Sequence, residues 1–395
     1  MSIPKIAYLS FDVVPAEKGA AVHVEAFVRA LGLSFGGVEL VTVAAAEPAK
    51  RVDWPGVQHT VLPAAGRTLI DRVLCFRQHL RQWLRGRKFE IVHIRSIFEG
   101  LPIVEQKSQL CQKLIFEVNG LPSIELKYRY PRVTADRELM HKLISQEQIC
   151  LRVADRIITP SPITRAYLIQ RNVDASCIQV IANGVDPAQF TYQPPRSEAT
   201  LHRFRLLYFG TLSAWQGVDL AIQALALYRR DFEAELTIAG PSRGDQVADL
   251  QKLAHKLDVA DRVHFLEAQP QAELVTLMHQ ADAIAAPLKP NDRNLVQGCC
   301  PLKILEGMAS GTPVITSDLP VVQALGENGL HFLAGTAGSA KAIKDVMLRL
   351  RAEPDLRLRL SAAARSRIEK SFTWQRANQT LIETYESLLA SARQP

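Results

Sequence analysis

The chain has 395 residues, of which 47% are hydrophobic and 22% are charged, and its formal net charge is +7. This length suits two or three globular domains, and the composition excludes a disordered or fibrous protein. The positive charge suits phosphate-bearing ligands or an anionic lipid surface, but no zinc-finger, RNP or helix-turn-helix pattern indicates a nucleic-acid partner.

The beginning of the chain and its cysteines both favour a reducing compartment. The first residues lack the basic and apolar regions of a signal peptide, and no apolar run reaches the roughly 20 residues that span a bilayer. The six cysteines form no CxxC pair and have no histidine at metal-ligand spacing. We therefore expect a cytoplasmic protein with reduced thiols and without a metal or cofactor.

Short β-rich apolar runs alternate with longer helical patterns, which is typical of parallel α/β architecture. In the first half, the expected strands are residues 5–11, 38–43, 91–94, 114–117, 156–159 and 178–181, with helices at 22–33 and 138–153. A polar stretch with two prolines at 191–200 then predicts a linker. Beyond it, the expected strands are residues 205–209, 235–239, 263–265, 283–286, 314–316 and 331–333, and a helix follows at 372–392.

This pattern predicts an α/β protein with two doubly wound, Rossmann-like domains. The first covers residues 1–195 and is joined by a C-terminal helix at 375–395, and the second covers residues 203–374. Ligands of such domains bind beyond the carboxyl ends of the strands. We therefore expect the domains to face a cleft, with the functional residues in the loops that follow the strands.

The loop after the first strand leads into an amphipathic helix through Gly19 and His23. Glycine before a helix lets the backbone approach a ligand phosphate, although the loop lacks the GxGxxG pattern of a dehydrogenase. His23 either lines the cleft or is structural. His93, at the end of a strand, is expected to be a core histidine with its hydrogen bonds satisfied.

Residues 67–88 combine apolar residues at helical spacing with seven lysine and arginine residues. The strands before and after this stretch predict a crossover helix that packs its apolar side on the sheet. The alternative is peripheral contact with an anionic surface, such as the inner face of a membrane.

The expected strand at 114–117 places Glu117 and Asn119 at its carboxyl end. Asn119 can hydrogen-bond but cannot act as an acid or base, which fits a mechanism that positions groups and stabilises charge. Glu125 and Arg129 follow. They are candidates for contact with a ligand in the cleft, with solvated surface charges as the alternative.

Pro301 predicts the start of a helix, since proline is favoured at the first helical position, and Gly311 predicts its end. The free N–H groups of a first helical turn bind anions, and Lys303 adds a positive charge there. Glu306 shares a face with Lys303 and can accept hydrogen bonds from a vicinal diol such as a ribose. A surface helix with an ordinary ion pair is the alternative.

The segment Lys-Ile-Leu-Glu-Gly-Met-Ala-Ser-Gly-Thr-Pro-Val-Ile at 303–315 resembles the donor-binding segment of retaining glycosyltransferases of family 4, the group 1 glycosyltransferases with the GT-B fold. Residues 154–161, 181–190 and 207–219 match the family in the same order. The resemblance covers nearly the whole chain, and the Pro-Leu-Lys at 301–303 is similar to one subset of the family.

The resemblance implies a retaining, metal-independent hexosyltransferase. Its donor would be a nucleotide diphosphate sugar, which is a substrate and not a cofactor, and its acceptor a hydroxyl group of a glycolipid, polysaccharide precursor or small glycoside. Glu306 would bind the ribose. The candidates for the donor diphosphate and sugar are Gly19, Gly210, Thr211, Gly298, Cys300, Leu302 and Lys303, and those for catalysis are Glu117, Asn119 and His23. Glu125 and Arg129 are the candidates for contact with the acceptor. A nucleotide-sugar epimerase of the same fold and a non-catalytic sugar-nucleotide binder are the alternatives.

The chain also departs from the family pattern. Gly298 stands where the family usually has a glutamate that contacts the donor sugar, and Thr211 and Gln216 stand where an arginine and a lysine are common. We therefore expect Lys303 to be the principal phosphate cation, supported by the Thr211 hydroxyl and by Arg293 or Arg243.

Overall fold

The structure, a computed structural model, describes residues 5–16, 18–44, 50–196, 202–242 and 244–392. The chain divides into two compact units, one made of residues 1–182 and 377–395 and the other of residues 183–376. The boundary between the units thus lies between residues 182 and 183. The sequence predicts it later, at the polar stretch 191–200. Residues 183–193 belong to the second unit because they pair with it, for example through Gln193 N–H, which donates to Ser310 O at 3.0 Å.

The first unit contains a seven-stranded sheet in the order β3-β2-β1-β4-β5-β6-β7, and every neighbouring pair is parallel. Its strands are β1 (Ile6–Leu9), β2 (Val38–Val43), β3 (Val57–Leu62), β4 (Phe89–Ile94), β5 (Cys111–Glu117), β6 (Arg156–Thr159) and β7 (Ile178–Val180). Its helices are α1 (Gly19–Phe35), α2 (Leu69–Leu84), α3 (Ile97–Val104), α4 (Lys107–Leu110), α5 (Pro122–Arg129), α6 (Arg137–Val153), α7 (Pro162–Gln170) and α15 (Trp374–Ala392).

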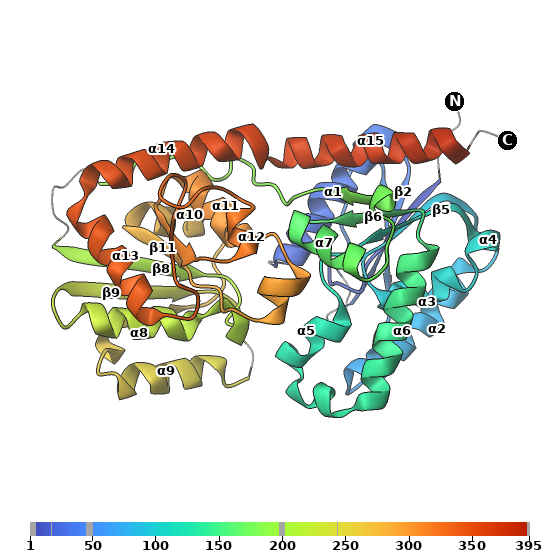
Figure 1. Cartoon of the computed structure of the whole chain (residues 1–395). Coiled ribbons are helices and arrows are strands. Elements are labelled where there is room, and N and C mark those ends of the chain that lie inside the picture. The colour runs from blue at the N-terminus through green and yellow to red at the C-terminus, as the bar shows by residue number, and fades with distance from the viewer. Residues whose placement is uncertain (1–4, 17, 45–49, 197–201, 243, 393–395) are drawn as a thin grey trace. The chain divides into compact units, whose positions relative to one another are not determined.

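Helices cover both faces of this sheet. Apolar side chains of α2, α3, α6 and α7 form one core with the strands, and α2, α3 and α6 lie together in Figure 1. On the other face, Tyr385 of α15 packs its ring against Phe35 of α1 and against His93 of β4. The sheet is therefore doubly wound, and the strand order reverses between β1 and β4.

The second unit contains a six-stranded parallel sheet in the order β10-β9-β8-β11-β12-β13. Its strands are β8 (Arg203–Phe209), β9 (Glu233–Ala239), β10 (Val263–Leu266), β11 (Ala283–Ala286), β12 (Val314–Ser317) and β13 (Leu333–Gly335). Its helices are α8 (Val218–Tyr228), α9 (Gln246–Lys256), α10 (Gln271–Gln280), α11 (Leu302–Ser310), α12 (Pro320–Gln323), α13 (Ala340–Ala352) and α14 (Pro354–Ser371).

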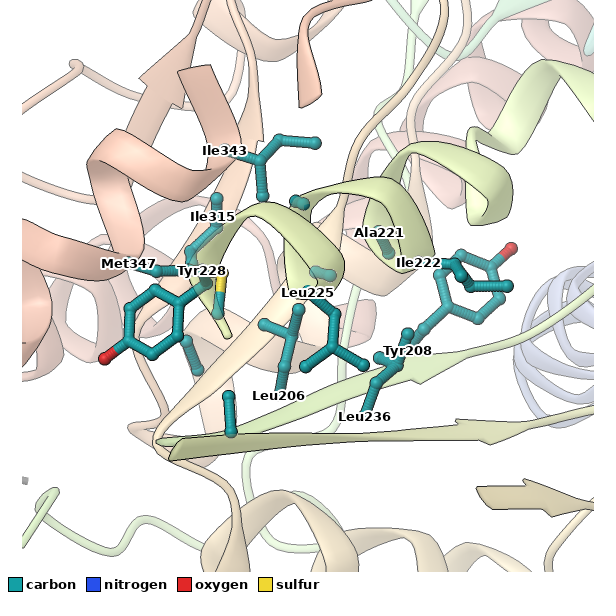
Figure 2. Close-up of a cluster of buried hydrophobic side chains, with 14 of the residues drawn as sticks. Leu206, Tyr208, Ala221, Ile222, Leu225, Tyr228, Leu236, Ile315, Ile343 and Met347 are labelled. Carbon is teal, nitrogen blue, oxygen red and sulfur yellow. The ribbon is translucent and has the colours of Figure 1, made fainter. Parts of the chain in front are cut away.

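The core of the second unit lies between its sheet and the helices α8, α9 and α13. Figure 1 shows α8 and α9 on one side of this sheet and α10 and α11 on the other. Figure 2 shows the core cluster, with labelled side chains Leu206, Tyr208, Ala221, Ile222, Leu225, Tyr228, Leu236, Ile315, Ile343 and Met347. The strand order reverses between β8 and β11, which is where doubly wound sheets bind ligands.

The predicted α/β class with two doubly wound parallel sheets is confirmed, although the expected elements miss β3 and start α1 three residues too late. β3 is an edge strand whose side chains are mostly half-buried, so it lacks the continuous apolar run of the central strands. None of the helices in the described part of the chain has the length and apolarity that a bilayer crossing requires.

Leu225→Ala is expected to destabilise the second unit, because Leu225 is fully buried between α8 and the sheet. Removing a buried leucine side chain costs about 2–5 kcal/mol in unfolding free energy. The matched control is Leu358→Ala on α14, since Leu358 is 39% exposed, and its effect should stay within about 0.5 kcal/mol. Urea denaturation of the full chain measures both, and equal shifts would contradict this packing.

Candidate functional site

The start of α11 differs by one residue from the prediction. Pro301 is the N-cap, with φ −74° and ψ 105°, and the helix begins at Leu302, because this extended ψ keeps the proline outside the helix. The helix ends at Gly311, whose φ is +86°, as predicted. Proline offers no side-chain cap, and in the described part of the chain the N–H groups of Leu302 and Lys303 donate to no acceptor. These amides are therefore available to an anion.

Lys303 is a buried cation, 8% exposed. Its Nζ lies 3.5 Å from the centroid of the Tyr208 ring and donates to Gln216 Oε1 at 3.4 Å. Among the described residues, no carboxylate oxygen lies within 4.0 Å of this Nζ. Burial lowers the pKa of Lys303 well below its usual value, although Glu306 opposes the shift. An anion that reached Nζ would therefore raise this pKa again and favour the charged form of the side chain.

Glu306 lies one helical turn beyond Lys303 and is half-buried. Burial raises the pKa of its carboxyl group to about 7, while Lys303 acts in the opposite direction. Each group therefore shifts the pKa of the other in the direction that favours the charged form, although the two side chains form no ion pair. Its role at the ribose stays a prediction.

The loop between β8 and α8 is fixed beside Lys303. Gly210 has φ +103°, and a Cβ atom on it would lie 3.5 Å from Lys303 Cε. The Tyr208 hydroxyl donates to Thr211 O at 2.5 Å, so this tyrosine holds the loop as well as the cation. Gly217, at the start of α8, also has positive φ, and a Cβ there would lie 1.9 Å from Pro287 O. Glycine is therefore required at 217 for close approach as well as for conformation.

The residues before α11 come from a short π-helix, Arg293–Gln297, which ends at Gly298 with φ +84°. The Arg293 guanidinium lies 3.9 Å from the centroid of the Trp215 ring, so it is held at the β8–α8 loop, and its role near the phosphates stays a prediction. Asn183 Nδ2 donates to Cys300 O at 2.7 Å, a contact that sequence reasoning missed. Arg243, the alternative cation, lies outside the described residues.

In the first unit, Glu117 at the end of β5 lies at the centre of a buried polar network, with 1% exposure. The Tyr8 hydroxyl donates to its Oε2 at 2.7 Å, and Arg95 Nε donates to its Oε1 at 2.9 Å. The Asn119 amide also donates to Oε1. Arg95 is not among the residues predicted from the sequence. The only local signal for it is its position, as a charged residue directly after the buried strand β4.

Two histidines complete this network. His23 Nε2 lies 3.0 Å from Glu117 Oε1, and His93 Nε2 lies 3.1 Å from Oε2. The other ring nitrogen of His93, Nδ1, lies 2.7 Å from the Tyr385 hydroxyl. His93 is therefore a fully buried core histidine, but its Nε2 lies near Glu117 without forming a hydrogen bond, so only one of its two ring nitrogens is satisfied among the described residues.

Burial alone would raise the pKa of Glu117, but His23 and Arg95 beside it hold that pKa well below its usual value. A carboxylate kept ionised in this way is unsuited to proton transfer at neutral pH. The geometry instead gives Glu117 a positioning role for His23 and Asn119, whose own part in catalysis stays a prediction.

The remaining predicted residues lie on two helices of the first unit. Gly19 is the first residue of α1, at the carboxyl edge of the sheet. Glu125 and Arg129 lie on α5. The Glu125 carboxylate lies against Gly120, where a Cβ atom would be 2.3 Å from Oε1, and Arg129 is exposed beside the Tyr130 ring. Their contacts with donor or acceptor stay predictions.

Most of the basic stretch at 67–88 forms α2 (Leu69–Leu84), a crossover helix between β3 and β4 as predicted. Thr68 and Asp71 form a capping box at its start, and Phe76 and Leu80 are fully buried in the core. Arg77 is buried and donates to Ile97 O and Phe98 O at 2.8 and 2.9 Å, so it serves the fold. Membrane contact through this helix stays a prediction. Among the residues that the structure describes, no group of three or more His, Cys, Asp or Glu side chains is placed to hold a metal ion.

Comparisons with known proteins agree with this architecture. The model of Glycosyltransferase Family 4 matches residues 18–189, and the model of Glycosyl transferases group 1 matches residues 193–367. The glycogen synthase of Mycobacterium tuberculosis is 33% identical over 228 residues, which cover 55% of this chain and 50% of that protein. The chain thus spans about half the length of this curated relative.

Two solved structures are similar along nearly the whole chain. Sucrose-phosphate synthase from Thermosynechococcus elongatus has a TM-score of 0.83 at 20% identity, with 98% of this chain and 100% of that chain covered. Anabaena Alr3699/HepE in complex with UDP-glucose has a TM-score of 0.73 at 17% identity, with coverages of 97% and 100%. These likenesses show the GT-B fold.

Glu117→Gln is expected to lower the unfolding free energy by about 3–5 kcal/mol at neutral pH, as when a buried ion pair loses one partner. A depressed carboxyl pKa stabilises the folded state above the unfolded pKa of about 4.3, and this stabilisation is lost as the pH falls toward the folded-state pKa. The deficit should therefore be constant from about pH 5 to 8 and shrink below about pH 4.

Denaturation midpoints of wild type and variant across this pH range measure the effect. The control is Glu105→Gln, since the ion pair of Glu105 with Arg81 is largely exposed and should contribute less than about 1 kcal/mol. A Glu117→Gln deficit as small as that of the control would contradict the network.

Proposed function

We propose that this chain, which consists of a family 4 glycosyltransferase domain followed by a group 1 glycosyltransferase domain in the GT-B fold, transfers a hexose from a nucleotide diphosphate sugar to a hydroxyl acceptor. The observation that carries the proposal is Lys303, a buried ammonium without a carboxylate partner among the described residues. It lies in the first turn of α11, beside two open backbone amides. A diphosphate supplies the negative charge that this arrangement lacks.

The donor is proposed to bind the second unit. Its diphosphate would accept hydrogen bonds from the amides of Leu302 and Lys303 and from Lys303 Nζ, with Arg293 and the Thr211 hydroxyl as further donors. Its ribose hydroxyls would donate to Glu306, one turn along the same helix. Because these cations and amides compensate the charge of the diphosphate, we propose transfer without a metal ion.

We propose transfer with retention of the anomeric configuration. The anomeric carbon–oxygen bond to the diphosphate breaks, the acceptor oxygen bonds to the same face of the carbon, and the acceptor proton passes to a phosphate oxygen of the leaving group. Lys303 and the α11 amides would stabilise the charge on that leaving group. This route asks no protein carboxylate to act as nucleophile, which suits the buried and fully engaged Glu117.

The first unit is proposed to bind the acceptor, with Glu125 and Arg129 of α5 as contacts and Asn119 and His23 held in place by Glu117. A lipid-linked acceptor would agree with peripheral membrane contact through α2. Transfer is favoured over epimerisation because two of the proteins reported above are named as synthases.

The proposal is tested first with UDP-, GDP- and ADP-sugars in a thermal-shift panel, followed by an assay of nucleoside diphosphate release. A donor present at 100 times its Kd stabilises the folded chain by about 2.7 kcal/mol. Release that depends on an added hydroxyl acceptor supports transfer. Conversion of the sugar without acceptor or release would support an epimerase, and binding without turnover a non-catalytic binder.

Lys303→Ala is expected to weaken donor binding at least about tenfold, because one charge-assisted hydrogen bond contributes about 1.5–3 kcal/mol. Isothermal titration with the donor that the panel identifies measures the change in Kd. Lys252→Ala is the matched control, since Lys252 on α9 has a 77% exposed side chain. An unchanged Kd for Lys303→Ala would refute the diphosphate assignment.

Glu306→Gln is expected to weaken nucleoside diphosphate binding in a pH-dependent way. The pKa of Glu306 is raised to about 7, and the ionised carboxylate is the better acceptor for ribose hydroxyls. The ratio of the variant Kd to the wild-type Kd should therefore rise about tenfold between pH 6 and pH 8. A ratio that does not change with pH would show that the Glu306 carboxylate does not bind the ribose.

A further inference from the structure

The chain enters the second unit at Asn183 and leaves it after Arg376, and these two segments are joined directly beside the unit boundary. Val185 N–H donates to Phe372 O at 2.8 Å, and Trp374 N–H donates to Val185 O at 3.2 Å. These bonds form a short parallel bridge between Val185 and Thr373. The entering and leaving segments therefore form one rigid strap within the second unit.

Gly184 shows how closely the strap is packed. A Cβ atom at this position would lie 2.3 Å from Trp374 N and 2.5 Å from Thr373 C. Because both atoms belong to the backbone, no side-chain movement could relieve such a contact. Glycine at 184 therefore brings the neighbouring Asn183 to a fixed place beside the leaving segment.

Asn183 extends from this strap to the residues that precede α11. Its Nδ2 donates to Cys300 O at 2.7 Å, across 117 positions of sequence. Cys300 directly precedes Pro301, the N-cap, and α11 has no side-chain cap of its own. The orientation of the Cys300–Pro301 peptide, and with it the direction in which α11 begins, therefore depends on the bond from Asn183.

We infer that Asn183 is a positioning residue that fixes the start of α11 to the strap through which the chain enters and leaves the second unit. The consequence for binding rests on the proposed function, in which the amides of Leu302 and Lys303 hold the donor diphosphate. Loss of the Asn183 bond frees the Cys300–Pro301 peptide to rotate and misaligns these amides. A misplacement of about 1 Å in such a site can cost about a hundredfold in rate.

The kinetic test compares Asn183→Ala with Val185→Ala in the full chain. Asn183→Ala is expected to raise the KM for the donor at least fivefold while the KM for the acceptor stays unchanged. Val185 is 1% exposed, so its truncation weakens the same strap through packing but leaves the Cys300 bond in place. It should lower the Tm without changing the donor KM. Equal donor KM values for the two variants would overturn the inference.

A second readout does not require sugar transfer. Cys299 and Cys300 are 5% and 6% exposed, and the loop that holds them is anchored by Asn183. Asn183→Ala should increase the rate of iodoacetamide labelling at these two thiols several-fold, as located by mass spectrometry, whereas Val185→Ala should not. An unchanged labelling rate would overturn the positioning role. If wild type binds no sugar nucleotide, the proposed function fails, and the labelling result still decides the role of Asn183.

Discussion

Burying an ionisable side chain costs free energy unless neighbouring groups compensate its charge, and this constraint has opposite solutions in the two units. In the first, the Glu117 carboxylate is surrounded by two histidines, an arginine, a tyrosine hydroxyl and an amide. In the second, the Lys303 ammonium has an aromatic face and one amide oxygen as its partners. The charge of Glu117 is thus compensated within the protein, whereas the charge of Lys303 is compensated by a ligand only in the proposed function.

This difference separates a charge that serves the fold, that of Glu117, from a charge that is proposed to bind a ligand, that of Lys303. A compensated carboxylate fixes its neighbours in one arrangement, and the depressed pKa of Glu117 reflects the charges of His23 and Arg95 beside it. The lowered pKa of Lys303 and the raised pKa of Glu306 reflect an environment that disfavours charge on both groups. Perturbed groups at the carboxyl end of a sheet, where its strand order reverses, are typical of binding sites. A sugar nucleotide would offer anionic oxygens to one group and hydroxyl donors to the other.

The sequence predicts the fold well where local signals dominate. The bounds of β2, β6 and β11 match the expected strands, because each is a short buried apolar run. Pro301 was placed one residue too far into the helix, since the fixed φ of proline suits both the N-cap and the first helical position, and only ψ separates them. The sequence does not predict β3, because its residues have the pattern of a half-exposed edge strand. For the candidate site, local signals drew attention to Lys303 and Glu306, whose roles stay predictions. They did not reveal the tertiary partners of Glu117, since Tyr8 and His93 come from other strands and Arg95 follows β4.

Asn183 belongs to a sequence motif that identifies the family, and the structure shows that the residues of this motif also have physical roles. The run Asn-Gly-Val at 183–185 contributed to a family resemblance without any assigned contact, yet each residue has a distinct physical task. Val185 pairs with the leaving segment through its backbone, Gly184 permits that approach, and Asn183 uses the resulting fixed position to hold the peptide before α11. Because proline cannot cap its own helix with a side chain, the start of α11 relies on such an external anchor. The anchor lies where the chain enters the second unit, so the same three residues connect the chain and hold the start of the helix at which the donor is proposed to bind.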